Sequence, residues 1–190
     1  MFAELLASPG VVEDVVLRSS FGVMAFHGGS LERRTDDIAR RVADVAGASL
    51  YSVALPEDLR WHVPSKYVDP AESPPLAAFV DHVDVAIAVH GYGRDGWWTS
   101  ILLGGCNREL ATHVGARVRA VLPDYDVVDD LARVPVELRG LHPDNPVNRC
   151  RGAGVQVELP PRARGRGPRG RESTVDALVG ALVDAIATWR

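Results

Sequence analysis

Hydrophobic residues in this chain gather in short continuous runs that alternate with longer segments of helical spacing. The runs at 11–18, 21–27, 49–55, 83–91, 99–105, 126–128 and 155–159 predict strands. The runs at 21–27 and 83–91 are apolar almost throughout, which is typical of strands buried on both faces of a sheet. Each of these two runs ends at a His-Gly dipeptide.

Helical spacing covers four segments, 30–46, 76–82, 107–121 and a C-terminal stretch that starts at 173. The apolar stripe of the first segment is predicted to consist of Leu31, Ile38, Val42 and Val45. Asn107 and Ser173 are predicted N-caps, and residues 140–153 predict a loop. Strands alternating with helices predict an α/β fold, as one three-layer domain over residues 1–190. It has a mostly parallel mixed sheet with helices on both faces.

Composition narrows the class of protein. The chain has 190 residues, and its 21 basic and 25 acidic residues give a net charge of −4, which argues against bulk attraction to nucleic acid or anionic membrane. No apolar run reaches the roughly 18 residues of a membrane span, and the first residues lack the pattern of a signal peptide. We therefore expect a cytoplasmic protein. Cys106 and Cys150 are too few for a disulfide framework or a cysteine zinc site.

Two histidines and a glutamate stand where strands are predicted to end. His27 and His90 close the two apolar runs, and Glu32 is expected in the first turn of the helix that follows His27. Ligands of open α/β sheets bind beyond the carboxyl ends of the strands. Two imidazoles and one carboxylate, with one position left open, are typical of catalytic zinc. The pattern predicts one zinc ion per chain.

Other interpretations of these residues exist. Structural histidines at strand ends are common, and Glu32 could simply be a carboxylate favoured by the start of a helix. A serine hydrolase is disfavoured because no GxSxG motif occurs, and HExxH is absent as well.

A polar segment near the C-terminal end supplies candidates for the remaining chemistry. Glu158, on a predicted strand, suits a general base. Arg149 suits a clamp for a substrate carboxylate, and Asn148 could bind the same group. The alternatives are that Glu158 faces outward between Val157 and Leu159 and that Arg149 is a solvated cation. His62, in a Pro-rich loop, either lines the substrate cleft or is structural.

Six segments in order extend this pattern over most of the chain, from Phe21 to the terminal helix. They are HGGSLE, YSVALPED, LRWHVPS, VHGYG, LLGGCNREL and NPVNRCRGAGVQVEL. The whole resembles the zinc-dependent poly-γ-glutamate hydrolases of the phage type, which are compact relatives of the zinc carboxypeptidases. The resemblance implies that His27, Glu32 and His90 hold zinc and that Glu158 is the general acid and base. It also implies that Asn148 and Arg149 bind a substrate carboxylate.

The resemblance implies hydrolysis of an amide bond by a metal-activated water. The expected substrate is γ-glutamyl, as in poly-γ-glutamate, or a related acidic peptide or acyl-amino acid. Arg108, in GGCNR, is a further candidate that could stabilise the oxyanion. A small-substrate deacylase with the same metal chemistry is an alternative. The oligomeric state is left open.

An arginine- and glycine-rich stretch at 162–171 departs from the family pattern. We expect a flexible, solvated loop near residues 160–172. The cluster could attract a polyanionic substrate, or it could contact phosphates. The second possibility gives an alternative from another class, a nucleic-acid-binding or phage-replication accessory protein with a non-catalytic metal site.

Overall fold

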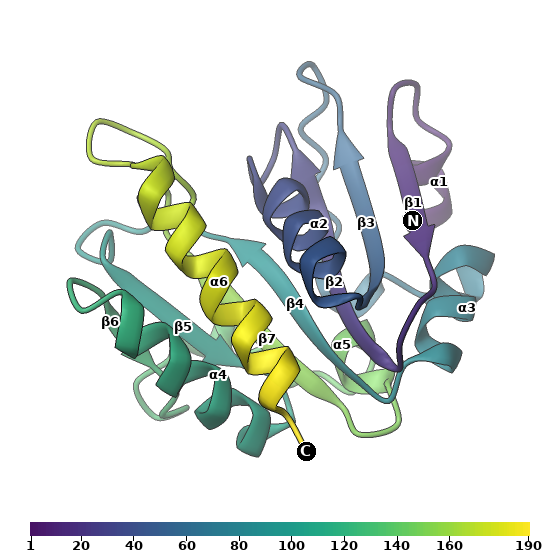
Figure 1. Cartoon of the computed structure of the whole chain (residues 1–190). Coiled ribbons are helices and arrows are strands. Elements are labelled where there is room, and N and C mark those ends of the chain that lie inside the picture. The colour runs from purple at the N-terminus through teal and green to yellow at the C-terminus, as the bar shows by residue number, and fades with distance from the viewer.

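Seven strands form one mixed sheet in the computed structural model, which describes all 190 residues (Figure 1). The strands are β1 Val12–Val16, β2 Phe21–Gly29, β3 Ser49–Leu55, β4 Val85–Gly91, β5 Ser100–Gly104, β6 Asp126–Val128 and β7 Gly154–Leu159. They lie in the order β1-β3-β2-β4-β7-β5-β6. Strands β3, β2, β4 and β7 run parallel, β1 is antiparallel to β3, and β5 is antiparallel to β7 and parallel to β6. The predicted mostly parallel mixed sheet is confirmed.

Helices cover both faces of this sheet (Figure 1). The long helices α2 Thr35–Ala46, α4 Arg108–Val121 and α6 Glu172–Thr188 pack on one face, and the largest hydrophobic cluster lies beneath them. The short helices α1 Phe2–Leu6, α3 Pro74–His82 and α5 Pro146–Arg149 contribute to a second cluster on the other face. The predicted three-layer architecture is therefore confirmed.

The alternation of side chains along the central strands decides which residues meet on the second face. In β4, Ile87 and Val89 face the long helices, whereas Ala86 and Ala88 face the short ones. Alternate residues of a strand point to opposite faces. His90 therefore follows Ala88 onto the face of the short helices. Glu158 lies beside His90 in the register of β4 and β7.

The first predicted helix is shorter than its hydrophobic spacing suggested. It begins at Thr35, because residues 30–34 form a turn in which Arg34 adopts a left-handed conformation with φ 75°. Leu31 packs against the second cluster, so it is not part of the helix stripe. Val45 is 70% exposed, so its assignment to the stripe was also wrong. The buried face of α2 consists of Thr35, Ile38, Ala39, Val42 and Ala43.

Other local predictions had mixed outcomes. Asn107 caps α4 as expected, because its side chain accepts a hydrogen bond from the Leu110 backbone N–H at 2.9 Å. Ser173 does not cap α6. This helix begins at Glu172, and Arg171 occupies the N-cap position. Helix α1 was not predicted, and α5 lies inside the segment expected to be a loop.

The arginine-rich stretch is partly built into the protein interior. Ala163 and Arg164 are buried. The Arg164 guanidinium donates hydrogen bonds to the carbonyls of Leu159, Arg33 and Tyr92. The expectation of a solvated loop is wrong for these two residues, since this guanidinium is used to join three backbone segments.

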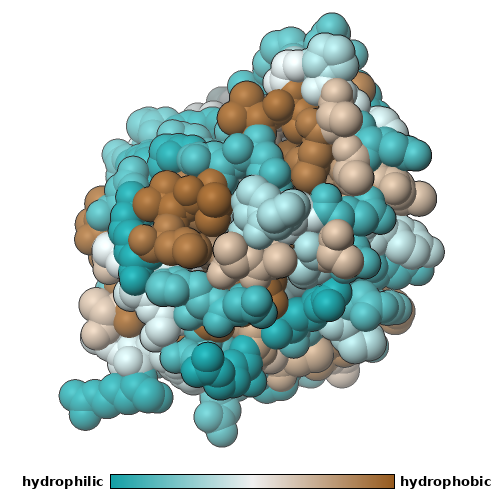
Figure 2. Space-filling view, turned by 90° about the vertical axis from the view of Figure 1, so that its right-hand side faces the viewer, coloured by the Kyte–Doolittle hydropathy of each residue, from teal (hydrophilic) through white to brown (hydrophobic).

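Strand β1 forms one edge of the sheet and carries Glu13 and Asp14. Charged side chains on an edge strand hinder pairing with other sheets. Figure 2 shows this side of the molecule, where patches of hydrophobic residues are separated by hydrophilic residues. None of the helices has both the length and the apolar character needed to cross a bilayer.

Matched substitutions on α2 test the assignment of its buried face. Val42 is fully buried and Val45 is 70% exposed, three residues further on. We expect Val42→Ala to lower the free energy of unfolding by roughly 1–3 kcal/mol, through lost burial and a cavity. Val45→Ala should change it by less than about 0.5 kcal/mol. Urea denaturation measures both, and equal losses in the two variants would contradict the assignment.

Candidate active site

The segment HGGSLE forms a tight turn that returns Glu32 to the end of β2. The Glu32 backbone N–H donates to the carbonyl of His27 at 2.8 Å, which closes the turn. Gly29 has a φ of 66°, and a Cβ there would lie 2.1 Å from the carbonyl oxygen of Leu55. Only glycine fits a backbone that is both left-handed and this close to the next strand. Glu32 lies in this turn and not, as predicted, in the first turn of the helix.

The Glu32 carboxylate is the centre of a buried polar cluster. One oxygen, Oε1, lies 2.9 Å from Nδ1 of His27. The other, Oε2, accepts a hydrogen bond from the Gly91 backbone N–H at 2.8 Å and lies 3.5 Å from Nδ1 of His90. Each of the two imidazoles predicted from the sequence therefore faces a different oxygen of the predicted carboxylate.

His27 is oriented by a contact on the far side of its ring. Its Nε2 lies 2.8 Å from the carbonyl oxygen of Val63, which can only accept a hydrogen bond, so Nε2 is the donor there and Nδ1 is the nitrogen that faces Glu32. Such a contact to a backbone carbonyl is the usual support of a metal-binding histidine. The pairing of β2 with β3 shifts between Ala25 and Gly28, and a bulge of this kind redirects side chains.

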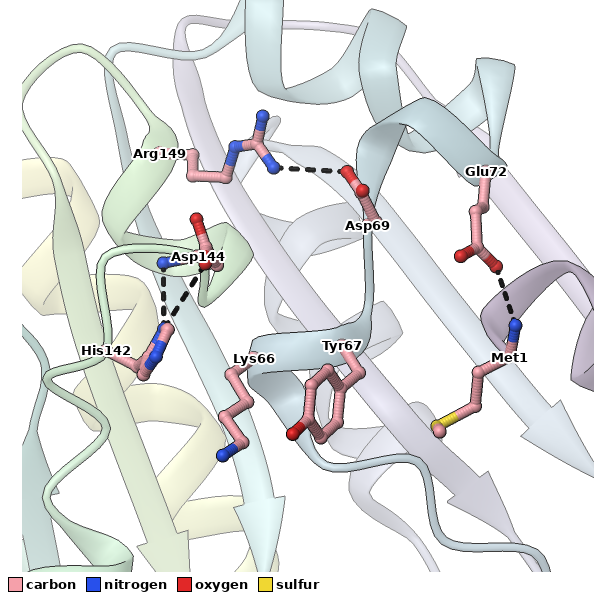
Figure 3. Close-up of a pocket in the computed structure, with 8 residues that line it drawn as sticks. All are labelled: Met1, Lys66, Tyr67, Asp69, Glu72, His142, Asp144 and Arg149. Carbon is pink, nitrogen blue, oxygen red and sulfur yellow. Dashed lines mark hydrogen bonds and ion pairs between the residues drawn. The ribbon is translucent and has the colours of Figure 1, made fainter.

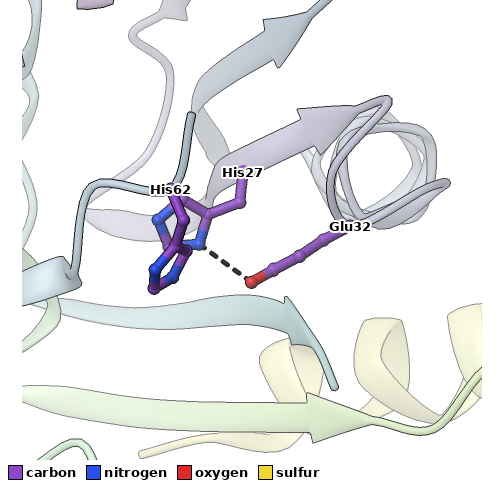
Figure 4. Close-up of side chains that lie close together, drawn as sticks. All are labelled: His27, Glu32 and His62. Carbon is purple, nitrogen blue, oxygen red and sulfur yellow. Dashed lines mark hydrogen bonds and ion pairs between the residues drawn. The ribbon is translucent and has the colours of Figure 1, made fainter. Parts of the chain in front are cut away.

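His62 joins the cluster from the loop after β3. Its ring centroid lies 4.6 Å from that of His27. Figure 4 shows His62 beside His27, with Glu32 pointing at the His27 ring. His27, Glu32 and His62 each offer a ligand atom, and these atoms all lie within 4.8 Å of one another. From the sequence His62 was expected either to line the substrate cleft or to be structural, because nothing in its spacing relates it to the HGGSLE turn.

His90 is only 3% exposed, and its Nε2 has no hydrogen-bond partner. A buried polar atom without a partner is costly, so a free ring nitrogen on a histidine that lines this cavity suits a metal ligand. Imidazole nitrogens and a carboxylate oxygen are donors that zinc accepts. The residues present therefore fit the predicted metal.

The two carboxyl groups of the cluster have opposite protonation tendencies. Burial acts to raise the pKa of Glu32, but the nearby His27 and His90 outweigh it and lower that pKa far below its usual value. Burial raises the pKa of Glu158 to about 7, and the negative charge of Glu32 adds to this rise. Burial opposes protonation of His90, but Glu32 outweighs it and raises the pKa of that imidazole.

Glu158 is held by a chain of amide side chains. Asn145 donates a hydrogen bond to Gln156 Oε1 at 2.8 Å, and Gln156 Nε2 donates to Glu158 Oε1 at 2.8 Å. Glu158 is 4% exposed. Its alternation with Val157 and Leu159 does turn it away from the long helices, but loops cover that face. The spacing of residues along a strand does not show which loops will cover it. Nothing in the sequence therefore predicted that Gln156 would hold the Glu158 carboxyl.

These groups line one cavity of about 650 Å³. Its wall includes His27, Glu32, His62, His90, Gln156 and Glu158, together with residues of the loops around 64–66 and 136–142. This volume is within the range of small-molecule sites. The catalytic and metal-binding candidates thus share one space that is open to a substrate.

Three further candidates lie outside this cavity. The Arg108 guanidinium donates to the carbonyls of Gly105, Leu103 and Asp129. The Asn148 side chain accepts from the Cys106 N–H and donates to the carbonyls of Gly140 and His142.

Arg149 pairs with Asp69 at 3.2 Å and lines a neighbouring cavity (Figure 3). Arg108 and Asn148 are engaged with the backbone, whereas Arg149 is accessible to a ligand.

Comparison with known proteins gives the class of this fold. It matches a metallo-carboxypeptidase from Burkholderia cenocepacia with a TM-score of 0.51 and 12% identity, over 97% of this chain and 66% of that one. A bacteriophage poly-gamma-glutamate hydrolase matches with a TM-score of 0.76 and 24% identity, over 97% and 92% of the two chains. The zinc-free form of YndL matches with a TM-score of 0.80 and 18% identity, over 97% and 94%. The fold is therefore carboxypeptidase-like.

Sequence comparison identifies the family. The model of the poly-gamma-glutamate hydrolase family matches residues 3–166, so the chain belongs to this family of enzymes. The SPbeta prophage-derived UPF0714 protein YoqZ of Bacillus subtilis (strain 168) is 27% identical over 139 residues, which are 72% of this chain and 47% of YoqZ. The chain thus spans about half the length of this curated relative. The resemblance seen in the sequence is confirmed.

The raised pKa of Glu158 makes the stability of the metal-free protein depend on pH. Because the folded pKa of about 7 exceeds the ordinary value of 4.5, the stability held by neutral Glu158 is lost as pH rises between these values. A glutamine at this position has no charge to gain. In chelator, Glu158→Gln should therefore gain on the order of 2–3 kcal/mol relative to the parent between pH 5 and pH 8. Urea denaturation at both pH values tests this, and a pH-independent difference would contradict it.

Proposed function

We propose that this chain is a zinc-dependent hydrolase that cleaves a γ-glutamyl amide bond, as in poly-γ-glutamate. The observation that carries the proposal is the buried Glu32 carboxylate between His27 and His90, with Glu158 on the adjacent strand. Membership of the poly-gamma-glutamate hydrolase family supports the γ-glutamyl substrate. One zinc ion per chain and a cytoplasmic location are part of the same proposal.

His27, Glu32 and His90 are the proposed zinc ligands. When bound, zinc supplies Lewis-acid activation of water and polarisation of the scissile carbonyl. Two imidazoles and one carboxylate leave a position open for these roles. The contact of His27 with the Val63 carbonyl and the hydrogen bond that Glu32 accepts from the Gly91 N–H fix the orientation of these two side chains.

His62 is the second candidate for the imidazole opposite His27. It offers a ligand atom within 4.8 Å of ligand atoms of His27 and Glu32, but it is an exposed residue of a loop. His90 is buried on a central strand and has an unsatisfied ring nitrogen. We therefore propose His90 as the ligand and His62 as a residue that lines the substrate side of the site.

Glu158 is the proposed proton carrier. Gln156 holds Oε1, which leaves Oε2 to take the proton of the attacking water and return it to the leaving nitrogen. In the metal-free chain burial raises the pKa of Glu158 to about 7, and a carboxyl whose pKa is raised in this way can accept and return a proton more readily than an ordinary glutamate. The divergent pKa values of Glu32 and Glu158 support the division of roles, since one carboxylate stays charged and the other exchanges a proton.

Arg149 is the proposed clamp for a substrate carboxylate. Its fork can hold a carboxylate through two hydrogen bonds. Both Arg149 and its partner Asp69 are partly exposed, so a substrate carboxylate can replace Asp69 in this pair. The hydrogen bonds of Arg108 and Asn148 to backbone atoms favour a supporting role for these two in the loops around the site.

The decisive experiment compares the zinc-loaded parent with Glu158→Gln on a γ-linked oligoglutamate, with amine release as the measurement. We expect the parent to cleave it and the variant to lose roughly 10²–10⁴-fold in kcat, because the proton carrier is gone. Its zinc content should remain that of the parent. Glu109→Gln, an exposed carboxyl in the first turn of α4, serves as the matched control and should keep full activity. Undiminished turnover by Glu158→Gln would remove Glu158 from the mechanism, and an inactive parent would refute the substrate.

A further inference from the structure

A second cavity adjoins the one that holds the candidate active site. It has a volume of about 480 Å³, and Lys66 and His142 line both cavities. Figure 3 shows the second cavity between the segment of Lys66 and Tyr67 and the segment that carries His142 and Arg149. A ligand too long for the first cavity can therefore continue past Lys66 into the second.

Two of the three carboxylates of the second cavity, Asp69 and Glu72, have partners within the protein. Asp69 pairs with Arg149 at 3.2 Å, and Asp144 lies 3.7 Å from His142. Glu72 accepts a hydrogen bond from the Ala3 backbone N–H at 2.7 Å. The Arg149 guanidinium and the Met1 ammonium beside Glu72 offset part of the negative charge that this cavity presents to an anionic ligand.

Lys66 is the cation at this junction that has no carboxylate partner. Its Nζ lies 4.8 Å from the centroid of the Tyr67 ring, and no ion pair or hydrogen bond engages it (Figure 3). It is also the only lysine of the chain, in which the other basic residues are arginines. A lysine on a flexible stem is a point charge that can follow a carboxylate without fixed geometry.

We propose that Lys66 binds a carboxylate of an anionic chain as that chain passes from the active-site cavity into the second cavity. The inference rests on the proposed function, because a γ-linked glutamate chain carries one free carboxylate per residue. It assigns a binding groove to the residues of the substrate beyond the cleaved bond. Lys66 then selects acidic polymers over neutral ones of the same length.

Binding in the absence of turnover tests the groove independently of cleavage. The protein is the zinc-loaded Glu158→Gln chain, and the ligands are a γ-linked pentaglutamate and its neutral amide counterpart, titrated by calorimetry at low salt. Lys66→Met is added to this chain, with Lys66→Arg to restore the charge. Arg169→Met is the matched control for general attraction by the arginine-rich stretch, because Arg169 is an exposed arginine of that stretch and lines neither cavity.

Lys66→Met should weaken pentaglutamate binding by roughly threefold to tenfold and leave the affinity for the neutral ligand unchanged. Lys66→Arg and Arg169→Met should retain the affinity for pentaglutamate. Three outcomes would overturn the groove: unchanged binding by Lys66→Met, equal losses in Lys66→Met and Arg169→Met, or no pentaglutamate binding at all. Lys66-dependent binding without cleavage by the parent would refute the proposed reaction and leave the groove standing.

Discussion

A buried carboxylate must be paired, and the pairing of Glu32 with two imidazoles organises the whole site. An isolated charge in a protein interior costs several kcal/mol, so it persists only beside opposite charges or hydrogen-bond donors. Glu32 meets this requirement with His27, His90 and the Gly91 N–H. Its negative charge raises the pKa of His90 and also adds to the rise in the pKa of Glu158. One buried charge thus sets the protonation of its neighbours.

The backbone around Glu32 brings this residue to the strand ends. The left-handed Gly29, packed against the Leu55 carbonyl, lets the chain reverse directly after β2. The pairing of β2 with β3 shifts between Ala25 and Gly28, so the His27 side chain does not follow the alternation of side chains between the two faces of the sheet. On the neighbouring strands, Arg164 joins the backbone at Leu159, Arg33 and Tyr92. The arginine-rich segment therefore supports the backbone around the site, although its composition suggested a solvated loop.

Much of this arrangement could be predicted from the sequence because it follows from strand ends and alternation. His27 and His90 close apolar runs, and parallel neighbouring strands bring their ends together. The contacts that depend on loops could not be predicted. Spacing gave no reason to place His62 beside His27, or to expect that Asn148 and Arg108 would be engaged with backbone atoms. Val45 has the right hydrophobicity for the core but lies outside the buried face of α2 and is 70% exposed, although the next residue, Ala46, packs against the core.

The central claim is that His27, Glu32 and His90 hold a zinc ion, and the zinc dissociation constants of single variants test it most directly. They can be measured by competition with a chromophoric chelator for the parent, His27→Ala, His90→Ala and His62→Ala. The account predicts that the first two variants lose more than the roughly 10–100-fold in affinity that removal of an outer supporting partner costs. It predicts that His62→Ala stays within about tenfold of the parent. Loss of zinc in His62→Ala with parent-like affinity in His90→Ala would contradict it.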